Sequence, residues 1–156
     1  MKKYISMLVA VFMLASVMTG CSAAEPQQSD MIITMQIENP VMTVNGEKKE
    51  IDPGRGTAPV IKNGRTLLPI RAVIEEMSGA AAWDEETQTV VLAMDNDIIV
   101  LAIGDSTAFI NEEQKALDVP PVLENGRTLL PIRFIAEGFH FTVSWDEKTQ
   151  TVEVKK

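Results

Sequence analysis

The spacing of hydrophobic residues changes twice along this chain from a period of two to a period of 3.6. Apolar and polar positions alternate up to Pro69 and again up to Pro131, which predicts β-strands. After each proline the apolar residues recur at i, i+3, i+4 and i+7, which predicts a short helix with one buried face. The two stripes are Ile70, Val73, Ile74 and Met77, and Ile132, Ile135, Ala136 and Phe139.

Asn-Gly dipeptides between apolar runs predict three tight hairpins, at 45–46, 63–64 and 125–126. The prolines close the return strands, since proline cannot donate to a strand ladder but fits the first turn of a helix. Gly79 is a candidate C-terminal stop for the first helix. The second copy has Phe141 at that position, so we expect its helix to end differently.

The chain is a tandem duplication. Its most similar segments are offset by 62 residues: 59–71 returns as 121–133, and 83–90 returns as 145–152. Upstream of them, 31–37 aligns with 97–103 at an offset of 66, because the first copy carries four extra residues in a Pro/Gly-rich loop near 53–56. Such fixed-period similarity predicts two copies of one structural unit.

We therefore expect a domain over 31–156, made of repeat 31–94 and repeat 97–156. Each repeat is predicted to contain antiparallel β-hairpins with one short α-helix packed on the sheet. The predicted fold class is α+β.

The N-terminus has the layout of an export signal: Lys2 and Lys3 precede an apolar run that is too short to span a bilayer. Met18-Thr19-Gly20-Cys21 resembles the lipobox of bacterial lipoproteins. We expect residues 1–20 to be a lipoprotein signal peptide, Cys21 to carry the lipid, and 21–30 to be a flexible tether. The alternative is cleavage after Ala24, which would discard Cys21 and release a secreted protein.

The charge balance argues against nucleic-acid partners. The chain has 14 basic and 22 acidic residues, a net charge of −8. Residues 1–20 hold two of the lysines and no acidic residue, so their removal leaves −10. A strongly acidic protein repels polyanions such as DNA and RNA.

The repeated motif Asn-Gly-Arg-Thr-Leu-Leu-Pro-Ile-Arg, followed by a helix, Trp-Asp and Thr-x-Thr-Val, resembles the copper amine oxidase N-terminal domain family, also called the stalk domain. The resemblance covers both copies. It implies a non-catalytic appendage of bacterial surface proteins, on a twisted antiparallel sheet with a helix. The oxidases themselves use copper held by three histidines and a quinone made from tyrosine. This chain has one histidine, His140, and one tyrosine, Tyr4, so no enzyme activity, metal site or cofactor is expected.

Three pairs of repeated residues are candidates for ligand binding. Trp83-Asp84 and Trp145-Asp146 could form sugar-binding surfaces, although we favour core anchoring for each Trp and turn formation for each Asp. Arg71 and Arg133 lie in the first turn of a helix, where a cation opposes the dipole. They could pair with Asp84 and Asp146, contact main-chain carbonyls, or bind an anion.

The sequence thus predicts a non-catalytic, lipid-anchored module on the extracytoplasmic face of the bacterial membrane. Its role would be binding or presentation at the cell envelope, with envelope glycan, another envelope protein or a further copy as the partner. A small-molecule or metal-binding sensor is the alternative, and a hydrolase ranks last. Ligand identity and oligomeric state do not follow from the sequence.

Overall fold

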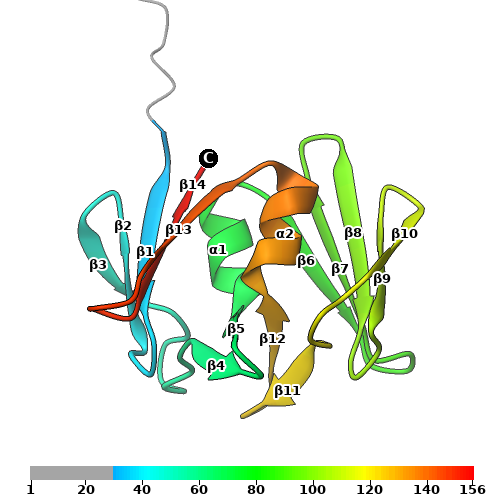
Figure 1. Cartoon of the computed structure of the whole chain (residues 1–156), viewed down its shortest axis with the longest axis horizontal. Helices are drawn as coiled ribbons and strands as arrows, with labels where there is room; N and C mark the ends of the chain where they lie inside the picture. The colour runs from blue at the N-terminus through cyan, green and yellow to red at the C-terminus, as the bar shows by residue number, and fades with distance from the viewer. Residues whose placement is uncertain (1–29) are drawn as a thin grey trace, which may run out of the picture.

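The computed structural model describes residues 30–156, which form three antiparallel sheets and two short helices (Figure 1). The first copy contributes β1 (Ile32–Gln36), β2 (Val41–Val44), β3 (Glu47–Glu50), β4 (Val60–Lys62), β5 (Arg65–Leu68), α1 (Ile70–Glu76), β6 (Ala80–Asp84) and β7 (Thr89–Met94). The second contributes β8 (Asp97–Ala102), β9 (Thr107–Ile110), β10 (Glu113–Ala116), β11 (Val122–Glu124), β12 (Arg127–Pro131), α2 (Ile132–Phe139), β13 (Thr142–Asp146) and β14 (Thr151–Lys155). The predicted signal peptide and Cys21 lie outside the described residues.

The α+β prediction is wrong, because the protein is mainly β. The two helices span only seven and eight residues, whereas the described chain forms fourteen strands. The helices also do not each cover a sheet built by their own repeat. They lie side by side between two five-stranded sheets, above a four-stranded sheet (Figure 1).

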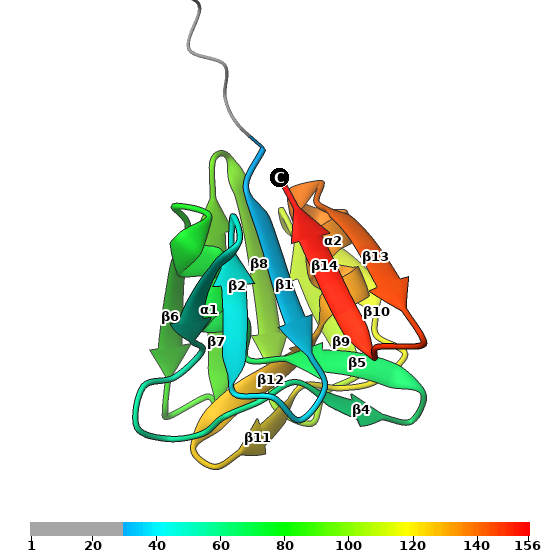
Figure 2. The same ribbon diagram turned by 90° about the vertical axis from the view of Figure 1, so that its left-hand side faces the viewer.

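Every sheet combines strands from both copies. The first has the order β13-β14-β1-β2-β3 and the second β10-β9-β8-β7-β6, so each takes three strands from one copy and two from the other. Figure 2 shows β1 and β14, from opposite ends of the described chain, side by side in the first sheet. The central sheet has the order β11-β12-β5-β4. Because the copies exchange strands, neither could close its sheets alone.

The two copies are related by an approximate two-fold axis through the central sheet. Leu68 of β5 is paired with Leu130 of β12, its own counterpart 62 residues later. Pairing of equivalent residues across a junction is what two-fold symmetry requires. Structural features of one copy should therefore have counterparts in the other.

The core lies between the five-stranded sheets and is filled largely by the helices. All eight residues of the two predicted helical stripes are buried, which confirms those predictions. Leu68 and Leu130 face this core, while Leu67 and Leu129 pack on the other side of the central sheet with Val119. The two leucines of the repeated motif are consecutive because their strand is covered by apolar side chains on both faces. No helix within residues 30–156 has the length and hydrophobicity to cross a bilayer.

The predicted hairpins are confirmed, and the two helices end differently, as expected. In all three Asn-Gly turns both residues have positive φ, as at Asn63 (50°) and Gly64 (71°). α2 extends to Phe139 and is capped by the left-handed His140 (58°), whereas α1 stops at Glu76 and is capped by Met77 (−85°). The left-handed residue of the first copy is Ser78 (64°), the counterpart of His140. Gly79 follows Ser78, where a Cβ would lie 2.9 Å from the carbonyl oxygen of Ala93. It permits a close approach of the backbones and does not supply the left-handed stop.

Candidate functional site

Trp83 and Trp145 lie near the ends of the edge strands β6 and β13. Each is paired across the sheet with a buried valine, Val90 or Val152, and therefore lies on the inner face. The tryptophans nevertheless keep 37% and 40% of their surface exposed. The prediction that they anchor the core is wrong, because the inner face of each sheet opens here onto a hollow.

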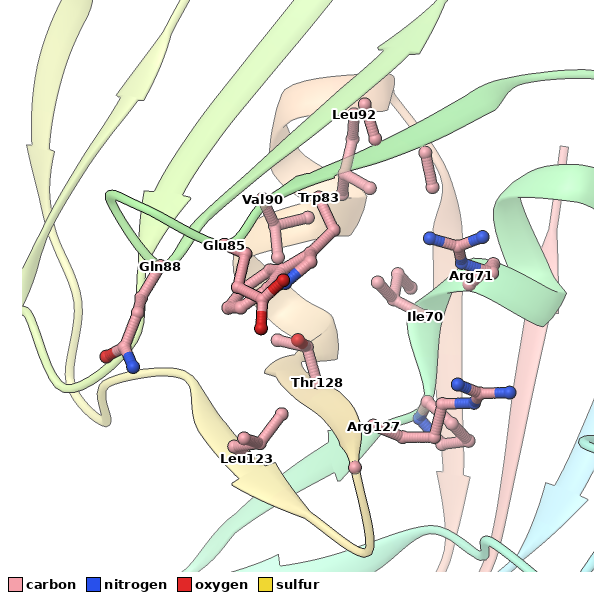
Figure 3. A pocket seen from close by; sticks show the side chains of 14 residues that line it. Ile70, Arg71, Trp83, Glu85, Gln88, Val90, Leu92, Leu123, Arg127 and Thr128 are labelled. Carbon is pink, nitrogen blue, oxygen red and sulfur yellow. The ribbon is translucent and has the colours of Figure 1, made fainter. Parts of the chain in front are cut away.

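The hollow beside Trp83, which we call the Trp83 hollow, has a volume of about 300 Å³ (Figure 3). Trp83, Glu85 and Gln88 come from β6 and the turn after it, and Arg71 comes from α1. The opposite side is built by the second copy, through residues of β11 and β12 and the turn between them. The site therefore exists only when both copies fold together.

A second hollow of about 330 Å³ surrounds Trp145, and we call it the Trp145 hollow. Each residue that lines it has a counterpart 62 positions away in the Trp83 hollow. Arg133, Glu147 and Gln150 replace Arg71, Glu85 and Gln88, and the β4–β5 hairpin replaces the β11–β12 hairpin. The duplication has produced two equivalent open sites.

Arg71 and Arg133 line the hollows, and neither pairs with the aspartate proposed for it. The Nη1 atom of Arg71 lies 4.0 Å from Oε1 of Glu75, one helical turn later, and both side chains are more than half exposed. Within residues 30–156 Arg133 has no ion-pair partner closer than 4 Å. Both cations are therefore accessible from their hollows.

Asp84 and Asp146 form turns outside the hollows, as predicted for their structural role. Asp84 Oδ1 accepts hydrogen bonds from the main-chain N–H groups of Glu86 (2.9 Å) and Thr87 (3.2 Å). Asp146 Oδ1 does the same for Lys148 and Thr149. Hydrogen bonds from main-chain N–H groups lower the pKa of both carboxyl groups. The largest contribution comes from Thr87 for Asp84 and from Lys148 for Asp146. Oδ1 of each aspartate is thus used by the chain itself.

Two ion pairs join the copies beside the hollows. Arg127 donates to Asp52 through Nε (2.7 Å) and Nη2 (3.0 Å), a bidentate geometry. The hydrogen bond from Arg127 is the main cause that lowers the pKa of Asp52. Arg65 donates to Asp118 through Nε (2.9 Å) and Nη2 (2.7 Å), but both hydrogen bonds reach the same oxygen, Oδ2.

The residues of the ion pairs and the glutamates and glutamines of the hollows recur in both copies, although they were not among the candidate site residues predicted from the sequence. Arg65 and Arg127 occupy the same place in the repeated motif, and Asp52 and Asp118 are related by the 66-residue offset of the upstream segments. The glutamates and glutamines of the hollows also recur, at 85 and 147 and at 88 and 150. Recurrence alone could have marked these positions, but only the fold shows that each arginine pairs with an aspartate of the other copy and that each hollow is lined from both copies.

The described residues do not fit a copper centre. Within 30–156 no three side chains of His, Cys, Asp or Glu come together as a metal site. His140 is 82% exposed, and Asp97, at 3.9 Å, is its charged neighbour. Tyr4, the one tyrosine of the chain, lies outside the described part. No reaction step through copper or a tyrosine-derived quinone can be built from these residues.

The fold and its paired hollows define a duplicated, mainly β module. Residues 56–154 match the copper amine oxidase N-terminal domain family. The match covers more than half of the chain, so the chain belongs to this family, and the assignment from the repeated motif is confirmed. The matched region is the family's N-terminal domain, which is non-catalytic and stalk-like, and not the domain that oxidises amines.

A primary amine oxidase from Klebsiella aerogenes is similar to this chain, with 26% identity over 101 residues. Those residues are 64% of this chain but only 13% of that enzyme. The similarity thus spans a small part of the relative, and its activity does not transfer with it.

Proposed function

We propose that this protein is a non-catalytic binding module displayed at the bacterial cell envelope, where it presents two equivalent hollows to envelope glycan or to another envelope protein. The observation that carries the proposal is the pair of open, tryptophan-lined hollows related by the internal two-fold axis. Exposed aromatic side chains in a concave site favour ligand binding over a purely mechanical role.

The chemistry of the described residues supports a binding role over catalysis. Neither hollow contains a histidine, cysteine or serine among its lining residues. Each contains one glutamate, whereas hydrolysis of glycosidic bonds commonly needs two carboxyl groups that flank the bond. We therefore place a hydrolase behind a small-molecule-binding sensor, which would use the same hollows.

A display role at the envelope rests on the sequence near Cys21. A lipid on this residue would hold the module at the outer side of the membrane, while residues up to 30 act as a tether. Expression in a bacterium fed an alkyne-labelled fatty acid tests this part. We expect label on the wild-type protein and none on Cys21→Ser; equal labelling of both would refute the anchor.

Binding itself is tested with a soluble chain that begins at residue 22, since residues 30–156 contain all of the described strands and helices. Purified, protein-free wall glycan is sedimented with increasing amounts of this chain. In parallel, solubilised envelope proteins are passed over the immobilised chain. We expect saturable retention by one of these materials that a heat-unfolded sample lacks. If neither material is retained, the proposed function is wrong.

A further inference from the structure

We infer that the Trp83 and Trp145 hollows are two equivalent sites for uncharged sugar rings. This inference rests on the proposed function and names its ligand class. It would make each chain bivalent, because the two-fold axis places the hollows on different sides of the molecule.

Each hollow has two apolar walls that water reaches. Trp83 lies across from Leu123, which is 53% exposed, and Trp145 lies across from Ile61, which is 46% exposed. These four residues are most of the large exposed hydrophobic residues in 30–156; the other two are Ile98 and Phe109 on the second sheet. An indole face opposite an aliphatic side chain accommodates the C–H face of a pyranose ring.

Polar groups surround the apolar walls. In the Trp83 hollow they are Arg71, Glu85, Gln88 and Thr128, which come from α1, the β6–β7 turn and β12 (Figure 3). Together they offer guanidinium and amide donors and carboxylate, amide and hydroxyl acceptors. The hydroxyl groups of a sugar both donate and accept hydrogen bonds. A site with donors and acceptors therefore suits a sugar better than it suits a ligand that only accepts hydrogen bonds.

The charge of each hollow favours a neutral ligand. Asp52 neutralises Arg127 through two hydrogen bonds, and Asp118 neutralises Arg65. In the Trp83 hollow this leaves one cation, Arg71, and one anion, Glu85. A phosphate or sulfate site needs an excess of cations or main-chain donors. The net charge of −8 on the whole chain adds further repulsion for anions.

The size of each hollow limits the ligand. Volumes of about 300 and 330 Å³ lie at the low end of those of small-molecule sites. Each hollow therefore suits one or two sugar rings of a longer chain. The two sites should bind the same sugar with similar affinity, since every residue that lines the Trp145 hollow has a counterpart in the Trp83 hollow.

Tryptophan fluorescence provides a direct test, because the two tryptophans of this chain are the ones in the hollows. The chain from residue 22 also lacks tyrosine, so its emission reports on these sites alone. The probes are a β-1,4-linked N-acetylglucosamine tetramer, a β-1,4-linked glucose tetramer and inorganic phosphate. We expect a saturable change in emission with at least one of the neutral tetramers and none with phosphate.

Single variants then assign the signal. Trp83→Ala leaves Trp145 as the reporter of its own hollow, and Trp145→Ala leaves Trp83; each should keep one site. The double variant should lose binding in calorimetry, with affinity at least about tenfold weaker. Phe109→Ala, which removes an equally exposed aromatic ring outside the hollows, is the matched control and should bind as the parent does. Leu123→Ala should weaken the Trp83 site alone, and it tests that site without removing an indole.

The outcomes separate this inference from the proposed function. Saturable binding of a neutral tetramer that depends on Trp83 and Trp145 supports both. If wall glycan or an envelope protein is retained equally by the parent and by the folded double variant, the sugar assignment is overturned. The proposed binding role at the envelope then stands, but the tryptophan faces of the hollows are not its binding surface. Retention of envelope material without any binding of the neutral tetramers, or a response to phosphate alone, overturns the sugar assignment. No retention and no response overturns both.

Discussion

The two five-stranded sheets have equivalent inner faces and unlike outer faces. Along one cross-strand row of the second sheet, the outer residues are Ala82, Val91, Val100, Phe109 and Gln114. The corresponding row of the first sheet is Ser144, Glu153, Thr34, Thr43 and Lys48. One row is almost wholly apolar and the other wholly polar, although their positions are related by the same offsets.

The inner rows show no such divergence. Val90, Leu101 and Ala108 of the second sheet are buried, and so are their counterparts Val152, Met35 and Met42 in the first. The contrast teaches that the fold constrains the inner faces and the hollows, while the outer faces were free to change. The apolar outer row is not needed for folding, since the first sheet forms without one.

The largest effect is expected from the residues on the two-fold axis. Leu68→Ala and Leu130→Ala each remove a fully buried side chain of the core, so each should lower the free energy of unfolding by about 2–5 kcal/mol. Because every sheet uses both copies, denaturant unfolding followed by circular dichroism should show one transition in both variants. Two separate transitions would mean that the copies fold independently.

The two ion pairs between the copies should differ in strength. The side chain of Asp52 is 15% exposed, whereas that of Asp118 is 71% exposed. Water and salt screen the second pair more, so Arg127→Ala should cost about 1 kcal/mol and Arg65→Ala less than about 0.5 kcal/mol. Chemical denaturation of both variants measures this difference, and equal losses would contradict it.

Acid should weaken the Arg127–Asp52 pair. The pKa of Asp52 is lowered in the folded protein, chiefly by the hydrogen bond from Arg127. The stabilisation is therefore complete above the ordinary aspartate value of 3.8 and is lost as the pH falls through the lower folded pKa. In Asp52→Asn the free energy of unfolding should fall less steeply on acidification below pH 4 than in the parent, although Asp84 and Asp146 still contribute. An unchanged pH profile would show that the pair has no such role.

The β9–β10 hairpin can be stabilised by copying its counterpart. Glu112 holds a positive φ of 71° at the position where the β2–β3 hairpin has Gly46. Left-handed backbone is strained for a residue with a Cβ, so Glu112→Gly should raise the stability by up to about 1 kcal/mol. The reverse change, Gly46→Glu, should lower it by a similar amount. A lower melting temperature for Glu112→Gly would contradict this account of the turn.

The smallest effect on stability is expected on the divergent outer faces. Replacing Val100 and Phe109 by threonine installs the residues that the first sheet has at those positions. The free energy of unfolding should change by no more than about 0.5 kcal/mol for each, since neither side chain belongs to the core. A loss as large as that of Leu68→Ala would show that the apolar row is part of the structural core.

The features that could be predicted from the sequence are those fixed by residues close together along the chain. Asn-Gly turns, prolines before the helices and apolar stripes act within a few residues, and these elements formed as expected. The α+β class failed because the helices span only seven and eight residues among fourteen strands. The sheet arrangement was missed because pairing of β1 with β14 joins residues about 120 positions apart, and a repeat pattern fits pairing within or between copies equally well. The tryptophans were assigned to the core because hydrophobicity does not show that an edge strand ends beside a hollow.

Counting the bound sugar sites tests the central claim most directly. Isothermal titration of the chain from residue 22 with the neutral tetramer that it binds should give two sites of similar affinity in the parent and one in Trp83→Ala, with both proteins folded. A single site in the parent, or a stoichiometry that Trp83→Ala leaves unchanged, would contradict the account of two equivalent hollows.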